Sequence, residues 1–342
     1  MTYIYKSTYK MKNFKYLLIG LPLTFMASCS SDDNTIEEEP KEYPIIVTAT
    51  ENPLGSTEGA KKGIKRAPIV TTTSLNQFYL FYGGYFNGGE NIEYDESIGT
   101  FTKQGTQWGS ILQWPPEYTG TNDNKVLNFY AFNAGESISG DYGEACIAVL
   151  VDQQTSDRQV DLLAAKNSVS YLSGNGVVPL TFDHISAAVQ VKLRKTESIS
   201  GYTVNVSEVI LHNIKYNGEY YFDRDTVWNL DDNLTNYTIF AADQSGSLEV
   251  STNYQLLAGE GDYLFLLPQK LTGWNKSAPL KDCYIEINCK IFNSDGYKVG
   301  SANEYKSVYL PLDATIKMGM INALNISMGT ALRNSDGTKI FQ

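Results

Sequence analysis

The sequence is poor in the residues from which most metal sites and catalytic triads are built. It has two histidines, His184 and His212, and four cysteines in 342 residues. Two histidines nearly exclude a His-rich metal site and leave few candidates for a Ser-His-Asp triad. The sequence also has no phosphate-binding glycine loop, zinc-ligand spacing or nucleophile elbow. We therefore expect no enzyme activity, no cofactor and no metal site.

Positive charge is scarce as well. The chain has 27 Lys and Arg against 38 Asp and Glu, a formal charge of -11. Because phosphate backbones are held by clustered positive charge, nucleic acid is excluded as a partner. Hydrophobic residues make up 42% and charged residues 19%, which indicates a globular chain with real cores. At about 150 residues per domain, the length favours two domains.

A long hydrophobic run is missing too. The most apolar stretch, residues 17–28, has 12 residues, whereas a membrane-spanning helix needs about 20. It follows Lys12 and Lys15 and ends in small residues, so residues 1–28 are predicted to be a secretory signal peptide. Ala27-Ser28-Cys29 resembles a bacterial lipobox, in which cleavage leaves Cys29 at the N-terminus and a lipid such as palmitate is attached to it. We expect a lipoprotein anchored to the outer membrane.

Residues 29–42 are polar and acidic and are predicted to be the tether behind the lipid. Ser30-Ser31-Asp32-Asp33 resembles the acidic export tag of surface lipoproteins, and a plain solvated linker is the alternative. The other cysteines are an odd set of three, which argues against a disulfide framework. Cys283 and Cys289 fall in one expected strand, where they would lie roughly 20 Å apart. We expect both to be core residues.

Apolar and polar residues alternate along most of the remaining chain, as strands with one buried face require. Cys283–Ile291 is the clearest case, and Val189–Leu193 and Tyr202–Val206 repeat the pattern. Leu127–Phe132 and Tyr263–Leu267 are densely apolar, which indicates strands covered on both faces. Asn217-Gly218 and Asp295-Gly296 are typical hairpin turns. These patterns predict an all-β sandwich architecture.

The Ser-, Gly- and Asn-rich stretch 167–176 is the best candidate for a domain boundary. We therefore expect an N-terminal β-sandwich domain at 43–172, a C-terminal β-sandwich domain at 173–330 and a short polar tail at 331–342. The first strand is expected within Tyr43–Thr50, followed by a basic loop up to Arg66.

Two weaker patterns have structural alternatives. Four aspartates surround Trp228, but they lack the residue order of a calcium loop, so a solvated loop is favoured. The four tryptophans are either a platform for sugars or core residues, and the core interpretation is favoured. Both histidines are expected to be structural. The residues concerned are Asp223, Asp225, Asp231, Asp232, Trp108, Trp114, Trp228 and Trp274.

Several segments, in their order along the chain, resemble the fimbrillin family of Bacteroides-type bacteria, the lipoprotein pilin precursors of FimA-type and Mfa-type fimbriae (type V pili). They are Trp114-Pro115 with Leu127–Phe132, Asp161–Ala165, Leu180–His184 and Leu266–Gln269. The resemblance covers roughly residues 43–330. It implies two tandem transthyretin-like β-sandwich domains behind the lipoprotein signal peptide.

The resemblance also implies a mechanism, donor-strand assembly at the cell surface. A trypsin-like protease cuts after a basic residue behind the first strand, that strand leaves, and a strand from another subunit takes its place. Removing a strand exposes unpaired backbone groups beside an apolar groove, and an incoming strand satisfies both. Arg66 is the candidate cleavage residue and Ala67 the new N-terminus, the alternative being a basic loop that is never cut. Asp225-Thr226-Val227 resembles the O-glycosylation triplet of these bacteria, with Thr226 as acceptor.

We expect a surface-exposed fimbrial subunit that works in cell adhesion and assembles by strand complementation with other fimbrial subunits. Because the residues after Met328 are few and polar, a tip, accessory or anchor position is at least as well supported as a stalk position. The alternative is a solitary surface lipoprotein that binds glycans through aromatic loops. Glycans or proteins of host or bacterial surfaces are further candidate partners.

Overall fold

The described part of the chain is all-β, as the alternation predicts. The computed structural model describes residues 42–56, 75–83, 98–119, 125–134, 137–139, 145–151, 159–242, 246–258, 263–275 and 278–341. Helical structure in these ranges is confined to single turns. They are α1 (Tyr171–Gly174), η2 (Pro116–Tyr118) and η4 (Glu197–Ile199).

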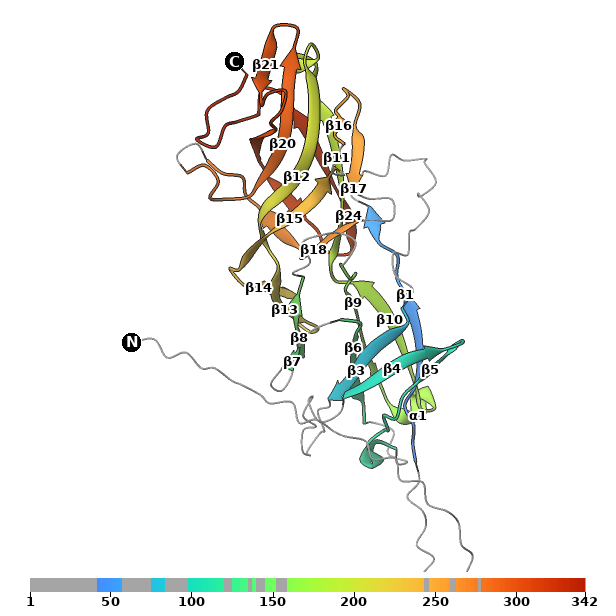
Figure 1. Ribbon diagram of the computed structural model, residues 1–342. Coiled ribbons are helices and arrows are strands. Elements are labelled where there is room, and N and C mark those ends of the chain that lie inside the picture. The colour runs from blue at the N-terminus through green and yellow to red at the C-terminus, as the bar shows by residue number, and fades with distance from the viewer. Residues whose placement is uncertain are drawn as a thin grey trace, which may run out of the picture. The chain divides into compact units, whose positions relative to one another are not determined.

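The first and largest sheet, sheet 1, has seven strands (Figure 1). Neighbouring strands pair antiparallel except the first pair, β1 and β10, which is parallel. In spatial order the strands are β1 (Ile46–Glu51), β10 (Val177–His184), β9 (Leu163–Val169), β6 (Leu127–Phe132), β3 (Gln77–Gly83), β4 (Ile98–Gln104) and β5 (Gln107–Gly109).

Both faces of sheet 1 are covered. In β6, Leu127, Phe129 and Ala131 belong to one buried cluster, while Tyr130 and Phe132 belong to another. Side chains alternate between the faces of a strand, so a continuous apolar run fills two cores at once. The prediction for Leu127–Phe132 is therefore confirmed.

A four-stranded sheet, sheet 2, packs on one of these faces. Ile147 and Val149 of its strand β8 share a buried cluster with Phe81 and Phe132 of sheet 1. The strands of sheet 2, in spatial order, are β14 (Trp228–Leu230), β13 (Asn217–Tyr221), β8 (Cys146–Leu150) and β7 (Ser137–Ser139).

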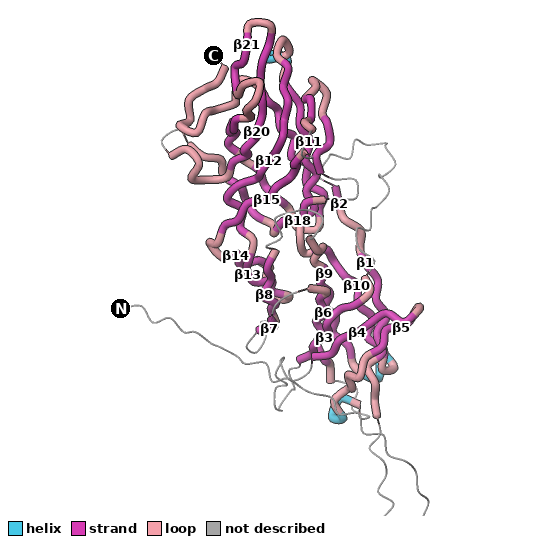
Figure 2. The backbone as a smooth tube through the Cα atoms, viewed as in Figure 1, coloured by secondary structure: helices cyan, strands magenta, loops and turns pink. Residues whose placement is uncertain are grey.

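Sheets 3 and 4 enclose the largest buried cluster (Figure 2). Val189, Val191 and Leu193 of sheet 3 meet Ile285 and Ile287 of sheet 4 there. Sheet 3 contains β17 (Gln255–Ala258), β11 (Ala187–Lys195), β24 (Met320–Met328), β2 (Gly55–Ser56) and β18 (Leu264–Leu266). Sheet 4 contains β15 (Leu234–Ala241), β12 (Thr203–Lys215), β20 (Tyr284–Asn293), β21 (Gly296–Val299), β16 (Leu248–Glu249) and β22 (Lys306–Pro311). The pair β19 (Gln269–Leu271) and β23 (Ala314–Ile316) forms a fifth sheet.

The stretch 167–176, where the sequence favours a domain boundary, lies within one sheet. It forms the end of β9, the turn α1 and the approach to β10, and these two strands pair with each other. The chain passes from sheet 1 to sheet 3 between His184 and Ala187. Contacts join Glu42–Gln342 into one unit. A division into two sandwich domains stays a prediction.

One of the two predicted hairpin turns is confirmed and the other is wrong. The hairpin expected at Asp295-Gly296 is present: Ser294 and Asp295 join the paired strands β20 and β21, and Gly296 is the first residue of β21. Asn217-Gly218 instead lies inside β13, which pairs with β8 and β14. The glycine is needed there for a close approach, because a Cβ at Gly218 would lie 2.4 Å from the backbone oxygen of Asn229.

The last described residues pack onto the body of the chain. Leu332 is fully buried, and Ile340 and Phe341 are 8% exposed in the cluster between sheets 3 and 4. Arg333 exchanges two backbone hydrogen bonds with Tyr309 of β22, each 3.0 Å long.

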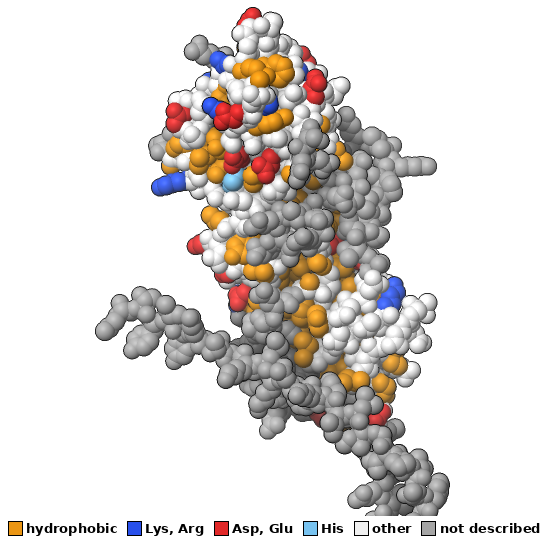
Figure 3. Space-filling model, in the orientation of Figure 1, with side chains coloured by type: hydrophobic (Ala, Val, Ile, Leu, Met, Phe, Trp, Pro, Cys, Tyr) orange, Lys and Arg blue, Asp and Glu red, His pale blue; other side chains and the backbone are white. Residues whose placement is uncertain are grey.

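On the face drawn in Figure 3, acidic and basic side chains are interspersed over the part that holds β12 and β20.

Candidate functional site

The first strand of the described chain closes one side of sheet 1. β1 pairs in parallel with β10 from Ile46–Val177 to Glu51–Phe182. Just before it, Ile45 donates to the backbone oxygen of Leu112 at 3.0 Å, and Trp114 donates to that of Tyr43 at 2.8 Å. Residues 43–51 therefore have backbone partners in two segments far away in the sequence, β10 along β1 itself and residues 112–114 just before it.

Inward side chains of residues 45 and 47 enter the core of sheet 1. Ile45 and Val47 are each 4% exposed and pack in one cluster with Val178, Leu180 and Phe182 of β10. Burying a side chain of this size stabilises the fold by about 1.5–3 kcal/mol. Removal of the strand would expose the β10 side chains together with an unpaired strand edge.

The same segment also reaches sheet 3. Gly55 and Ser56 form β2, which pairs in parallel with Met320 and Ile321 of β24. Leu54, next to β2, is 7% exposed in a small cluster with Ala188 and Phe265. Residues 43–56 thus contribute to two sheets, and losing them would open an edge in each.

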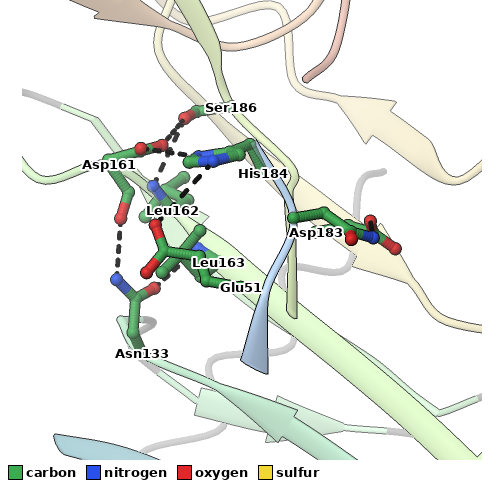
Figure 4. Close-up of polar contacts among 9 residues, drawn as sticks. Glu51, Asn133, Asp161, Leu162, Leu163, Asp183, His184 and Ser186 are labelled. Atoms are coloured by element: carbon green, nitrogen blue, oxygen red, sulfur yellow. Dashed lines mark hydrogen bonds and ion pairs between the residues drawn. The ribbon is translucent and has the colours of Figure 1, made fainter. Parts of the chain in front are cut away.

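A buried polar cluster lies beneath the end of β1 (Figure 4). Asp161 precedes β9, and its carboxylate accepts hydrogen bonds from His184 Nδ1 at 2.7 Å and Ser186 Oγ at 2.8 Å. Its backbone oxygen accepts from Asn133 at 2.7 Å. Because a carboxylate only accepts, these contacts place a proton on Nδ1 and direct Nε2 away from Asp161.

The other ring nitrogen faces β1. His184 Nε2 lies 3.9 Å from Glu51 Oε1, and the side chains of the two residues are 1% and 13% exposed. This is ion-pair range but too long for a hydrogen bond. Neither atom makes a hydrogen bond. His184 is buried, as expected of a structural histidine, but only one of its ring nitrogens is hydrogen-bonded.

Polar contacts fix the register of the strand end. Asn52 donates from its backbone to Phe182 O at 2.8 Å and from its side chain to Asp183 Oδ1 at 2.7 Å. The hydroxyls of Thr50 and Thr181 lie 3.2 Å apart. These contacts hold the strand end on which Glu51 faces Nε2 of His184.

The environment shifts the pKa of both facing groups upward. Burial alone would lower the pKa of His184, but the hydrogen bond and charge of Asp161, followed by the charge of Glu51, raise it above the ordinary 6.5. Burial raises the pKa of Glu51 above 4.5, and the charge of Asp161 adds to this. The charge of His184 opposes the rise, followed by a backbone hydrogen bond from Leu75 and the charge of Lys103. The folded chain therefore holds protons at this site more tightly than the unfolded chain.

Ser186, His184 and Asp161 do not form a hydrolytic triad. In a triad the serine hydroxyl bonds to the histidine nitrogen that faces away from the acid. Here Ser186 Oγ donates to Asp161 and accepts from the backbone of Leu162 at 3.3 Å. The cluster instead faces the end of β1 through His184 Nε2 and keeps a proton on His184 Nδ1.

Three of the residues singled out from the sequence, Cys29, Arg66 and Ala67, lie outside the described residues. Thr226 is exposed in the connection between β13 and β14. The free thiols of the described part are Cys146 and Cys289, both buried, and the half-buried Cys283. None of the described helices is long and apolar enough to cross a membrane.

The aspartates near Trp228 do not converge. Asp223 pairs with Lys166 at 3.0 Å and Asp232 with Lys215 at 2.8 Å, while Asp231 accepts from Asn217.

His212 lies 2.8 Å from Glu286 and stacks on Tyr284.

The tryptophans are packed. Trp114 and Trp274 are 1% and 7% exposed, and Trp108 and Trp228 are half-buried against apolar clusters. Trp228 also donates to the backbone oxygen of Ile185 at 3.0 Å. This packing favours the core interpretation over a sugar platform.

Sequence reasoning named Asp161 only as a member of a motif, expected His184 to be a structural histidine, and did not single out Glu51. A signal was present, because Ile45, Val47, Ala49 and Glu51 alternate along one face of the first strand. An acid that continues an apolar face needs a buried partner.

Comparison with known proteins gives a family. Residues 71–340 match the family model described as Fimbrillin-like. A solved fimbrial protein from Bacteroides vulgatus ATCC 8482 is 16% identical with a TM-score of 0.48, and the match covers 83% of this chain and 95% of that chain. A proposed cell adhesion protein from Bacteroides ovatus ATCC 8483 is 14% identical with a TM-score of 0.45, covering 88% and 96%. No curated protein sequence matches the chain.

Proposed function

This chain belongs to the fimbrillin-like family, and from that premise we propose that it is a fimbrial subunit of the cell surface that works in cell adhesion or fimbria assembly. The observation that carries the proposal is the placement of residues 43–56. They complete sheet 1 beside β10 and sheet 3 beside β24, yet they precede the basic loop that ends at Arg66.

Assembly would proceed by exchange of this first strand. Cleavage after Arg66 separates β1 and β2 from the rest of the chain, whose new N-terminus is Ala67. Departure of β1 uncovers Val178, Leu180 and Phe182 and one edge of β10. A strand from another fimbrial subunit would cover the same side chains and satisfy the same backbone groups. The family match begins at residue 71, shortly after the proposed cut.

Before cleavage, the precursor would be held on the outer membrane by lipid on Cys29, with residues 29–42 as tether. Lipid chains contribute about 0.8 kcal/mol per buried methylene, so more than one chain anchors a protein firmly.

Glycosylation at Thr226 is a further proposal, supported by the exposure of this residue. An intact mass that exceeds the sequence mass, and returns to it in Thr226→Ala, would support it.

Within a fimbria, we place this chain as an acceptor of strands, in a tip, accessory or anchor position. A donor strand must leave its own subunit, whereas Leu332, Ile340 and Phe341 are buried in the cluster between sheets 3 and 4. Releasing three large apolar side chains would cost several kcal/mol, since each contributes about 1.5–3 kcal/mol when buried.

Mass spectrometry of the N-terminus tests this function. Protein extracted from the cell surface is expected to start at Ala67, and Arg66→Gln is expected to retain residues 29–66 and to stay monomeric with partner subunits present. Lys61→Gln is the matched control and should be processed normally. An intact lipidated Cys29 with no cut at Arg66 in assembled material would overturn strand exchange and favour a solitary surface lipoprotein.

A further inference from the structure

The ring of His184 is held from one side and open on the other. Asp161 fixes Nδ1 of the ring and is itself held by the hydroxyl of Ser186, and both residues are 2% exposed or less. The other ring nitrogen, Nε2, therefore points at the strand position occupied by Glu51. A buried nitrogen without a hydrogen bond is unfavourable unless a nearby charge compensates it. The carboxylate 3.9 Å away supplies a compensating charge, and the backbone of Asn52 also favours the protonated ring.

Glu51 occupies an inward position of its strand. Side chains two apart share a face, so Glu51 continues the face that Val47 and Ala49 present to the core. A carboxylate at such a position is unfavourable unless it meets a positive partner. Conversely, an apolar residue at this position would leave His184 Nε2 buried and without its carboxylate.

We propose that His184 and Asp161 form a carboxylate-selecting site, and that any strand occupying the place of β1 must carry an acidic side chain where Glu51 lies. The partner is therefore a subunit whose complementing strand has apolar residues in register with Val178 and Leu180 and an Asp or Glu in register with Phe182. This inference rests on the strand exchange proposed above.

The remaining charged groups around the site do not replace His184. Asp183 of β10 is turned to Asn52, and Asp161 repels a second carboxylate. Lys103 of β4 is exposed and favours the charge of Glu51 only weakly, as the last of the influences on it. Positive charge at the site thus comes from the histidine ring. Selection for an acid should be stronger when that ring is protonated.

Peptide capture by the trypsin-cleaved full chain tests the selection. A labelled peptide of residues 42–56 is offered at pH 6, beside the same peptide with Glu51→Gln or Glu42→Gln. Glu42 is exposed, so its replacement changes the peptide charge equally without touching the site. We expect Glu51→Gln to weaken capture about tenfold more by the native cleaved chain than by a cleaved His184→Gln chain, which is the coupling expected of two facing groups. The difference should narrow at pH 8.

Equal capture of the native and Glu51→Gln peptides would overturn the selection while leaving strand exchange intact. If the native peptide is not captured, strand exchange itself is overturned. The preference for an acid is then tested in the uncleaved chain, in which β1 is still in place. There, Glu51→Gln should lower the urea midpoint at pH 6 more in the native chain than in a His184→Gln background, whereas Glu42→Gln should act equally in both. Equal effects of Glu51→Gln in the two backgrounds would overturn the carboxylate site by a route that needs no exchange.

Discussion

His184 and Glu51 each bind a proton more tightly in the folded chain than in water. Each group therefore contributes stability that is fully present below its unfolded pKa and is lost as the pH rises through its raised, folded pKa. The pH range over which each contribution is lost starts at the ordinary pKa of the group, 4.5 for Glu51 and 6.5 for His184. The stabilising contribution of this site thus belongs to the acidic end of the range.

We predict that the free energy of unfolding falls as the pH rises from 4.5 to beyond 6.5, by about 1.4 kcal/mol for each unit of pKa shift. Urea unfolding at a series of pH values measures this. Asp161→Asn removes the hydrogen bond and charge that raise the histidine pKa, so the decline above pH 6.5 should flatten in that variant.

Asp336→Asn is the control for this measurement. Asp336 is exposed, and hydrogen bonds from Thr338 lower its pKa below 3.8, so it titrates outside the window. A wild-type stability that rises between pH 5 and pH 8 would contradict the prediction, as would an Asp161→Asn variant with the wild-type slope.

At the scale of elements, β13 depends on a residue without a side chain. A Cβ at Gly218 would lie 2.4 Å from Asn229 O and 2.8 Å from Leu230 Cα, both backbone atoms of β14. Neither atom can rotate away. The two strands can therefore accommodate a larger residue only by moving apart.

We predict that Gly218→Ala lowers the free energy of unfolding by about 1–3 kcal/mol, the usual cost of overpacking. Gly201→Ala is the matched control, because nothing lies within 4 Å of the Cβ it would add. Thermal or urea unfolding of both variants measures the difference. A Gly218→Ala variant as stable as Gly201→Ala would show that β13 and β14 separate without cost.

Strand elements were largely predictable because burial of one face imposes a period of two on the sequence. Cys283–Ile291 shows this, since Ile285, Ile287, Cys289 and Ile291 all enter one cluster. The hairpin prediction at Asn217-Gly218 was wrong because a glycine required for close packing looks the same in the sequence as a glycine required in a turn. The polar site was not predictable as a unit, because Glu51, Asp161 and His184 become neighbours only when β1 pairs with a strand more than a hundred residues away.

At the scale of the whole molecule, the thiols report whether the cores are intact. Cys289 is fully buried between sheets 3 and 4, and burial raises its pKa to about 12. Burial also raises the pKa of the half-buried Cys283. The thiolate is the reactive form, so both thiols are protected by the fold.

We predict that iodoacetamide at pH 8 labels Cys283 slowly and Cys289 only when the chain unfolds globally. Peptide mass spectrometry at increasing urea concentration follows each site separately, with Cys283 as the internal comparison. Labelling of Cys289 in the native chain at the rate of Cys283 would mean that sheets 3 and 4 separate locally.

The parallel pairing of β1 with β10, and of β2 with β24, also bears on how the chain acquires its shape. Parallel partners distant in sequence are slow to find, because a long loop must close first. A precursor that folds with its first segment and then loses it would keep a conformation that its remaining sequence no longer encodes in full. Such a subunit would stay folded because its unfolding barrier is high, that is, by kinetic stability. Once denatured, it would refold only if another molecule supplied the missing strand.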